Sequence, residues 1–295
     1  MAPLDRPSES RSGAWKLDSG GSWPYGHIVD VTFGFALSRL FHGDLLTPGS
    51  RGHQGRAMGR IENPTVLDVG AGVGVYGAFF AGCLPEDRVG WTGIDGTEGV
   101  DDLSSKGPLP QPVKQVNLCS DGSYAMDHGV HDWSMSLEVG EHIPQSCLLT
   151  FLRTLDRSNR RGIVLSWGHL GQSGIGHISP RTGTDVASMM RFLGYWEDHN
   201  ASAMLTAAAE TPWFSVNPRV YRRRRPSSLE GLRWVPGDTV KRDREYYSRR
   251  ALAKFAKCQP RAHKAECEKQ NANVSTYCTC FRTQLDNCTA TRDPW

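Results

Sequence analysis

The stretch TVLDVGAGVG, residues 65–74, predicts a short buried strand that passes directly into a glycine-rich loop. Glycine is needed at Gly70, Gly72 and Gly74 because the chain turns tightly there and its backbone must approach a ligand without a Cβ in the way. After the loop, apolar residues recur at helical spacing: Val75, Tyr76, Phe79, Phe80, Cys83 and Leu84. We therefore expect a strand, a loop and a helix whose N-terminal N–H groups lie beside the loop.

A second strand is predicted from Val89 to Ile94, and Asp95 follows it, 21 residues after Gly74. A carboxylate at this place can accept hydrogen bonds from both ribose hydroxyls of an adenosine. A glycine loop followed by an acid at such a distance is typical of proteins that bind a nucleoside cofactor.

The rest of the core alternates between strand and helix patterns. Further strands are expected at 113–118, 133–137, 162–167 and, near the edge of the sheet, 219–223. Two more helices are indicated by apolar residues at helical spacing: Leu148, Leu152 and Leu155, then Val186, Met189, Met190 and Leu193. The alternation predicts a single α/β domain, Rossmann-like, with a mostly parallel sheet that helices cover on both faces.

The composition divides the chain into four parts. Residues 1–22 are rich in Ser, Gly and Arg, which predicts disorder. Residues 23–63 are expected to form an N-terminal helix that ends near Gly43, followed by a polar connector. The α/β domain covers 64–226, and 227–295 form a basic tail that contains cysteines.

Charge is distributed unevenly along the chain. Residues 219–295 carry 18 Lys and Arg against 8 Asp and Glu, whereas the whole chain has a net charge of only +3. Such a tail can bind an acidic partner, which would be nucleic acid, a membrane surface or a glycan. The alternative is that the tail is only solvated and has no partner.

The cysteines and the first residues bear on the compartment. Five of the eight cysteines lie in the last 38 residues, at spacings that match no standard zinc pattern, and they can be disulfide-bonded or free. Two glycosylation sequons, at Asn273 and Asn287, agree with a lumenal tail. The first 15 residues are polar, so no signal peptide is expected. The sequence as written is therefore expected to be cytoplasmic, or lumenal if its N-terminus is incomplete.

Over roughly residues 64–225, the chain resembles class I S-adenosylmethionine-dependent methyltransferases. The matching residues are 66–74, Asp95 and 132–142. The resemblance implies a seven-stranded sheet whose last strand is antiparallel. The pattern Gly-Gln…Gly-His at 171–177 also resembles a little-characterised methyltransferase group of algae and animals.

The resemblance also implies which residues bind the cofactor, S-adenosylmethionine. The glycines of the loop are expected along its methionine and ribose, and Asp95 is expected at its ribose. A polar residue after the third strand contacts adenine in the family, and here it would be Asn117. Asp68, just before the glycines, belongs to the same set, and Glu138 is expected to meet the amino group of the cofactor.

The segment LEVGEHIP, residues 137–144, follows the fourth strand at the edge where parallel sheets bind ligands. It resembles metal-dependent O-methyltransferases, including small-RNA 2′-O-methyltransferases and a ubiquinone-pathway enzyme. Glu138, Glu141 and His142 could converge on Mg²⁺, Mn²⁺ or Zn²⁺, with His177 or His169 as a fourth ligand. The interpretation preferred from the sequence is that the site holds no metal, that Glu138 contacts the cofactor and that His142 orders the loop.

The predicted reaction is methyl transfer to an unidentified acceptor, preferably a hydroxyl, with Glu138, His142 and His177 as the catalytic candidates. Glycines at 171, 174 and 176 predict a mobile flap around His177. Two alternatives stay open: a cofactor-binding scaffold without activity, and an NAD-dependent oxidoreductase, because residues 72–77 also spell G-x-G-x-x-G. The arginines at 222–225 could bind phosphates, but an edge strand whose arginines face water is preferred.

Overall fold

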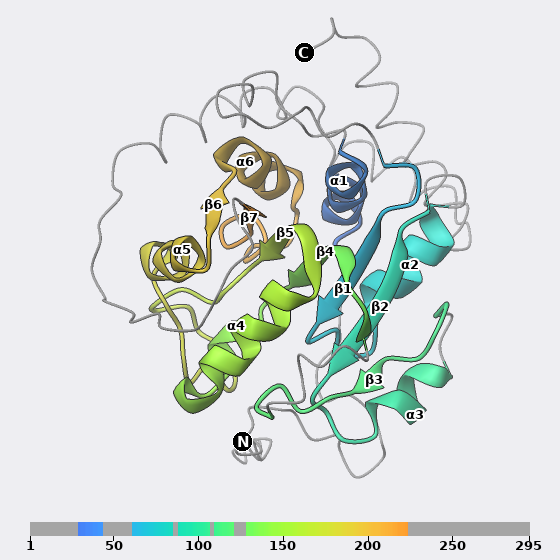
Figure 1. The fold of residues 1–295 in the computed structure, drawn as a ribbon, viewed down its shortest axis with the longest axis horizontal. Coiled ribbons are helices and arrows are strands. Elements are labelled where there is room, and N and C mark those ends of the chain that lie inside the picture. The colour runs from blue at the N-terminus through green and yellow to red at the C-terminus, as the bar shows by residue number, and fades with distance from the viewer. Residues whose placement is uncertain (1–28, 44–60, 85–87, 107–108, 121–127, 224–295) are drawn as a thin grey trace, which may run out of the picture.

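The computed structural model describes residues 29–43, 61–84, 88–106, 109–120 and 128–223 (Figure 1). The predicted disordered segment 1–22, most of the connector and the basic tail 227–295 lie outside these residues. Within the described part, every helix is too short or too polar to cross a bilayer.

One seven-stranded sheet forms the centre of the domain. Its strands lie in the order β3-β2-β1-β4-β5-β7-β6. All neighbouring strands are parallel except β7, which pairs antiparallel with both β5 and β6. The strands are β1 Thr65–Val69, β2 Gly90–Asp95, β3 Lys114–Gln115, β4 His131–Ser136, β5 Asn159–Leu165, β6 Tyr195–Glu197 and β7 Arg219–Arg223. The predicted α/β fold with a mostly parallel sheet is confirmed, as is the antiparallel last strand that the family resemblance implied.

Helices cover both faces of this sheet (Figure 1). They are α1 Val31–His42, α2 Val75–Cys83, α3 Val100–Ser105, α4 Leu148–Arg157, α5 Gly183–Phe192 and α6 His199–Ala208. Apolar residues of α1, α2 and α6 form one buried cluster, and those of α4 and α5 form the other. Successive strand residues point to opposite faces, so Val66 of β1 belongs to the first cluster and Leu67 to the second.

Three elements were not predicted, and one strand is shorter than expected. The elements α3, β6 and α6 have short or alanine-rich sequences with weak periodicity. The predicted strand 113–118 is reduced to β3, because Asn117 Oδ1 accepts a hydrogen bond from Cys119 N at 2.9 Å and turns the chain away from the sheet. The strand β7 has the predicted bounds but lies inside the sheet, since β6 forms the edge.

The interpretation that the arginines of this strand face water is wrong for those that the structure describes. Arg222 donates to Asp198 at 3.1 Å and its guanidinium lies 4.7 Å from the centre of the Trp133 ring. Arg223 forms an ion pair with Asp156 at 3.1 Å. Burial lowers the pKa of Arg222. These side chains therefore stabilise the position of β7 in the sheet.

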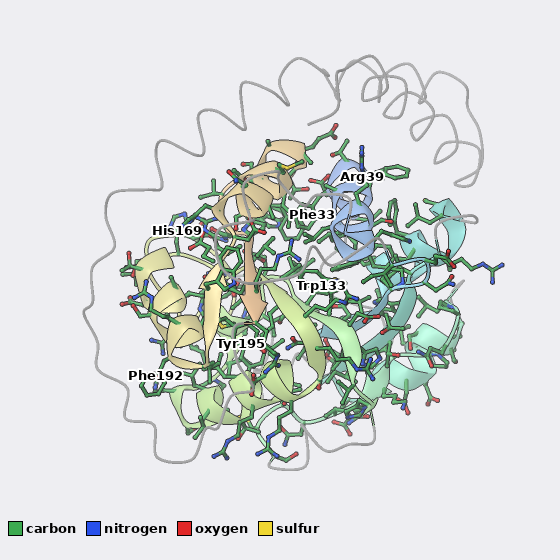
Figure 2. All side chains as sticks on the ribbon, turned by 45° about the horizontal axis from the view of Figure 1, so that its top comes forward. Phe33, Arg39, Trp133, His169, Phe192 and Tyr195 are labelled. Carbon is green, nitrogen blue, oxygen red and sulfur yellow. A yellow bond between two sulfur atoms is a disulfide. The ribbon has the colours of Figure 1, made fainter. Side chains whose placement is uncertain are left out.

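The first helix, α1, is part of the domain core. Phe33 stacks on Phe214 with ring centres 4.8 Å apart, and Phe41 lies 5.8 Å from Trp133 of β4. Phe33 and Trp133 are labelled in Figure 2, beside and below α1. The buried N-cap, Asp30, accepts four hydrogen bonds: from Thr32 Oγ1 and Phe33 N on one oxygen, and from Glu210 N and Thr211 N on the other. One carboxylate thus caps α1 and fixes it to the loop before β7.

We predict that Asp30→Ala lowers the free energy of unfolding by about 2–4 kcal/mol, because it removes a helix cap and leaves two loop N–H groups without acceptors. Asp30→Asn should cost less, since one amide oxygen can still serve either the helix or the loop. Urea denaturation followed by circular dichroism measures both. Equal stability of wild type and Asp30→Ala would contradict this role.

Candidate cofactor and metal site

The predicted glycine loop runs from the end of β1 across the end of β2. The N–H groups of Gly70 and Ala71 donate to Ile94 O at 2.8 and 3.0 Å. Gly70 has a φ of 80°, and a Cβ there would lie 2.4 Å from the side chain of Val139, which follows β4. Only glycine therefore fits between the ends of β2 and β4. Gly74 ends the loop and is the N-cap residue of α2.

Asp95, at the carboxyl end of β2, lies against this loop. Its Oδ2 accepts from Gly72 N and its Oδ1 from Thr97 N, both at 2.8 Å. Each carboxylate oxygen can accept more than one hydrogen bond, so a pair of ribose hydroxyls can add to these contacts. Two of the predicted cofactor contacts, the loop glycines and Asp95, thus lie against each other.

Asp68 lies beneath the loop and is buried. Its Oδ2 accepts from Trp91 Nε1 at 3.1 Å. Burial raises its pKa from 3.8 to about 7, and the negative charge of Asp95 contributes to the rise. Asp68 is therefore largely protonated in mildly acidic solution, and a cationic ligand above the loop would favour its ionised form.

The raised pKa gives a pH-dependent contribution to stability. Between pH 4 and pH 7 the folded state holds a proton on Asp68 that the unfolded chain has lost, so this contribution falls as the pH rises through that window. Asp68→Asn cannot ionise and keeps an acceptor for Trp91. We predict that the free energy of unfolding of this variant, measured relative to wild type, rises by on the order of 3 kcal/mol between pH 4 and pH 8.

Urea denaturation at several pH values measures the difference, with Asp101→Asn, at an exposed position in α3, as the control for loss of a carboxylate. A constant difference between Asp68→Asn and wild type across this range would show that Asp68 titrates normally.

Asn117 lies just after β3, at the same edge of the sheet, in an exposed position. Two residues later, Cys119 forms a disulfide with Cys147, which directly precedes α4. The predicted adenine contact and the segment that carries His142 are therefore joined covalently. Neither the pairing nor its position was predicted from the cysteine spacing.

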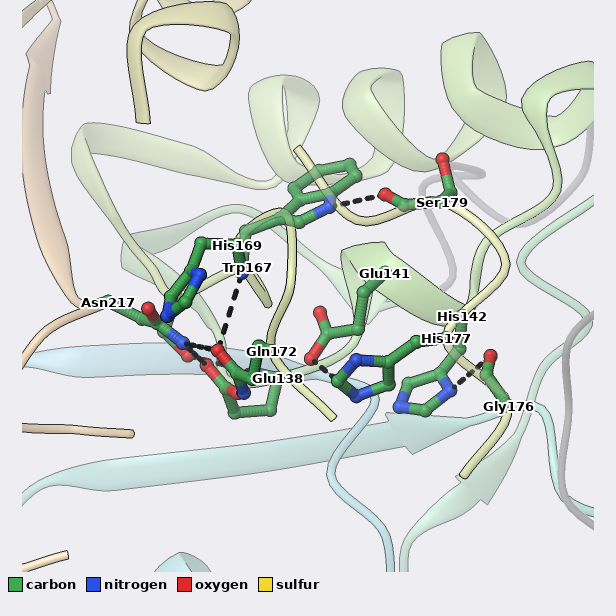
Figure 3. Close-up of polar contacts among 11 residues, drawn as sticks. Glu138, Glu141, His142, Trp167, His169, Gln172, Gly176, His177, Ser179 and Asn217 are labelled. Carbon is green, nitrogen blue, oxygen red and sulfur yellow. Dashed lines mark hydrogen bonds and ion pairs between the residues drawn. The ribbon is translucent and has the colours of Figure 1, made fainter. Parts of the chain in front are cut away.

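Glu138 follows β4 in a left-handed conformation, with a φ of 55°. Its N–H donates to Ser166 Oγ at 2.8 Å, and its carboxylate accepts from Gln172 Nε2 and Asn217 Nδ2 at 2.8 and 2.9 Å (Figure 3). Asn217 Nδ2 also lies 2.8 Å from Gln172 Oε1. These contacts join the end of β4 to the loops before α5 and before β7, and Asn217 was not recognised from the sequence.

The backbone of a non-glycine residue at this φ is strained. Replacing Glu138 by alanine and by glycine tests for this strain. Glu138→Ala and Glu138→Gly both lose the carboxylate contacts, but only glycine relieves the backbone. We predict that the glycine variant is more stable than the alanine variant by about 1 kcal/mol.

At Asp102, an exposed position in α3, the same two substitutions should rank in the opposite order, because glycine disfavours a helix. Denaturation curves of the four variants decide the matter. An alanine variant at 138 that is as stable as the glycine variant would rule out the strain.

Glu141, His142 and His177 form the second part of the site. One potential ligand atom of each lies within 4.8 Å of those of the other two. Glu141 Oε1 is 3.8 Å from His177 Nε2, and the two imidazole rings have centres 5.0 Å apart (Figure 3). Three of the four predicted metal ligands are therefore brought together. Glu138 is outside this group, and His169 is also outside it, with its Nδ1 2.9 Å from Leu170 O.

The Glu141 carboxylate is buried, and no donor among the described residues reaches either oxygen in good hydrogen-bond geometry, although the backbone N–H groups of Glu141 and Gly168 lie near it. Burial raises its pKa well above the ordinary value for a glutamate, and the charge of Glu138 adds to the rise. His142 Nδ1 lies 2.9 Å from Gly176 O and must donate to it, which leaves the lone pair of the neutral ring on Nε2. Burial lowers the pKa of His142 to about 4, so the ring is neutral near pH 7.

The glycine-rich loop predicted as a flap carries His177 and lies against Glu141 and His142. A Cβ at Gly174 would be 2.1 Å from His177 Nε2, and one at Gly168 would be 3.1 Å from Glu141. Ile178 N and Ser179 N both donate to Glu141 O, at 3.0 and 2.7 Å. The main chain at Gly168 and Gly174 therefore lies against the cluster, and a side chain at either position would crowd Glu141 or His177.

The order of the sheet identifies the fold. In the dinucleotide-binding order 3-2-1-4-5-6 the last strands are parallel, whereas here an antiparallel β7 lies between β5 and β6. The chain has a class I methyltransferase fold. This is the arrangement that the resemblance of residues 64–225 implied.

No protein-family model and no curated protein matches the sequence. Solved structures do match. Magnesium protoporphyrin IX methyltransferase from Synechocystis PCC 6803 with bound SAH is 15% identical over 68% of this chain and 90% of its own, with a TM-score of 0.41. PKMT2 from Rickettsia typhi in complex with AdoHcy is 18% identical over 57% of this chain and 29% of its own, with a TM-score of 0.38.

The plantazolicin methyltransferase BpumL in complex with SAH is 14% identical over 47% of this chain and 48% of its own, with a TM-score of 0.33.

Proposed function

We propose that this protein is an S-adenosylmethionine-dependent methyltransferase that transfers a methyl group to an acceptor hydroxyl with the help of a divalent cation. The observation that carries the proposal is the position of Asp95, whose carboxylate is held by Gly72 N–H against the glycine loop of a class I methyltransferase sheet. The Glu141, His142 and His177 cluster lies after β4 and β5, at the same edge of that sheet.

The cofactor would be held by the loop from Gly70 to Gly74, by Asp95 at the ribose and by Asn117 at the adenine. Bound S-adenosylmethionine supplies a methyl group that its sulfonium already activates. The protein then has to place the acceptor in line with that methyl group and exclude water. Glu138 is held by Gln172 and Asn217 at the end of β4, and we assign it to orienting the cofactor or the acceptor rather than to the metal.

The cation would be held by Glu141, His142 and His177. A neutral imidazole whose Nδ1–H is bound to a carbonyl is what a divalent metal requires of a histidine ligand, and the Glu141 carboxylate lies in the same cluster. Two imidazoles and one carboxylate suit Zn²⁺ or Mn²⁺ and, with added waters, Mg²⁺. A cation bound there lowers the pKa of a hydroxyl that it contacts. Without it, His142 would be a weak base, because its pKa is already low.

Calorimetric titration with S-adenosylhomocysteine tests the cofactor site. Wild type should bind it, Asp95→Ala should bind more weakly by about 2–4 kcal/mol, and Asp95→Asn should lie between them. The physical reason is the loss of two ribose hydrogen bonds to a charged acceptor. Binding of NAD without binding of S-adenosylhomocysteine would contradict the proposal and favour an oxidoreductase.

The cation site is tested by calorimetric titration of metal-free protein with Mn²⁺, Zn²⁺ and Mg²⁺. Glu141→Gln and His177→Ala should each weaken binding on the order of tenfold or more, because each removes a ligand. His169→Ala is the matched control, since this exposed histidine belongs to the same loop but not to the cluster. Absence of binding in wild type, or an equal loss in the control, would leave the site without a metal.

A further inference from the structure

Exposed apolar side chains gather on two loops beside the site. Within the described residues, seven large apolar side chains are exposed. Three belong to the segment between β5 and α5: Leu170, Ile175 and Ile178, at 59%, 45% and 53% exposure. Two belong to the segment between α6 and β7: Trp213 and Val216, at 43% and 49%. The remaining two, Val130 and Leu149, lie elsewhere in the fold.

These two loops meet at the site. Gln172 of the first and Asn217 of the second both donate to the Glu138 carboxylate and lie 2.8 Å from each other. Ile175 and Ile178 flank His177 in the sequence, and Val216 directly precedes Asn217. The exposed apolar side chains therefore belong to the segments that hold Glu138 and the proposed metal ligands.

Few charges accompany these side chains. Across segments 137–147, 166–182 and 209–218, the acidic residues are Glu138, Glu141 and Glu210, and the only basic residue besides histidine is Arg181. Arg181 is already engaged, with a hydrogen bond to Gln145 and its guanidinium 5.8 Å from the centre of the Trp167 ring. A polyanion such as RNA requires several unpaired lysines or arginines along its path. These segments offer none.

We propose that the methyl acceptor is an uncharged, predominantly apolar molecule with one hydroxyl, bound by the loops 166–182 and 209–218. This inference rests on the proposed function, because it is the hydroxyl of this molecule that reaches Glu141, His142 and His177. The apolar body of the acceptor covers Ile175, Ile178 and Val216, which removes their surfaces from water. Displacement of water around the hydroxyl follows from the same contact.

The test uses 1-naphthol and 4-octylphenol as probes of apolar hydroxyl compounds, and a fluorescein-labelled single-stranded RNA as the polyanion. Each is titrated into full-length protein with S-adenosylhomocysteine and Mg²⁺ present. We expect at least one phenol to bind, and Ile175→Ser and Val216→Ser each to weaken it by about tenfold. Val130→Ser, equally exposed but at the amino end of β4, should leave it unchanged.

Affinity for S-adenosylhomocysteine, measured on the same proteins, separates the two proposals. Wild type that binds S-adenosylhomocysteine but neither phenol overturns the acceptor class and leaves the proposed function standing. RNA binding that is tighter than phenol binding, or phenol binding that falls equally in Val130→Ser, also overturns it. Wild type that fails to bind S-adenosylhomocysteine overturns the proposed function itself.

Discussion

The hydrogen bonds between the glycine loop and the end of β2 are the constraint on which the rest of the site depends. Gly70 and Ala71 donate to Ile94 O, and Gly72 donates to Asp95. These bonds require the loop to cross β2, which in turn requires β1 and β2 to be parallel neighbours that end at one level. Because β4 pairs with the other side of β1, Glu138 and Glu141 then emerge at the same edge.

The second part of the site depends on one tight contact after β4. A Cβ at Gly140 would lie 2.2 Å from the Trp167 ring, so only glycine lets the end of β5 pack there. The 3₁₀ turn Gly140–His142 points Glu141 into the protein, while the left-handed backbone of Glu138 sends its carboxylate toward Asn217. Glu138 thus has Gln172 and Asn217 as its hydrogen-bond partners, while Glu141, three residues later, lies with the two histidines.

The sequence predicted the features that depend on neighbouring residues. The glycine loop, Asp95 and the bounds of β7 follow from local patterns of small, acidic and β-branched residues. Gln172 was placed only in a flap and Asn217 was missed, because their partner Glu138 is 34 and 79 positions away and no spacing signals such a contact. The Cys119–Cys147 pairing and the ion pair of Arg222 with Asp198 were missed for the same reason.

The proposed function requires cofactor and cation to bind side by side at this edge of the sheet. Paramagnetic Mn²⁺ offers a test of this arrangement. The measurement is the proton NMR line width of the S-methyl group of S-adenosylmethionine while this ligand exchanges between its free and protein-bound forms. We expect Mn²⁺ to broaden this signal and Mg²⁺ to leave it sharp. We also expect Glu141→Gln to abolish the broadening while S-adenosylmethionine still binds. An S-methyl signal that stays sharp when Mn²⁺ and S-adenosylmethionine are both bound to wild type would show that the two sites lie far apart.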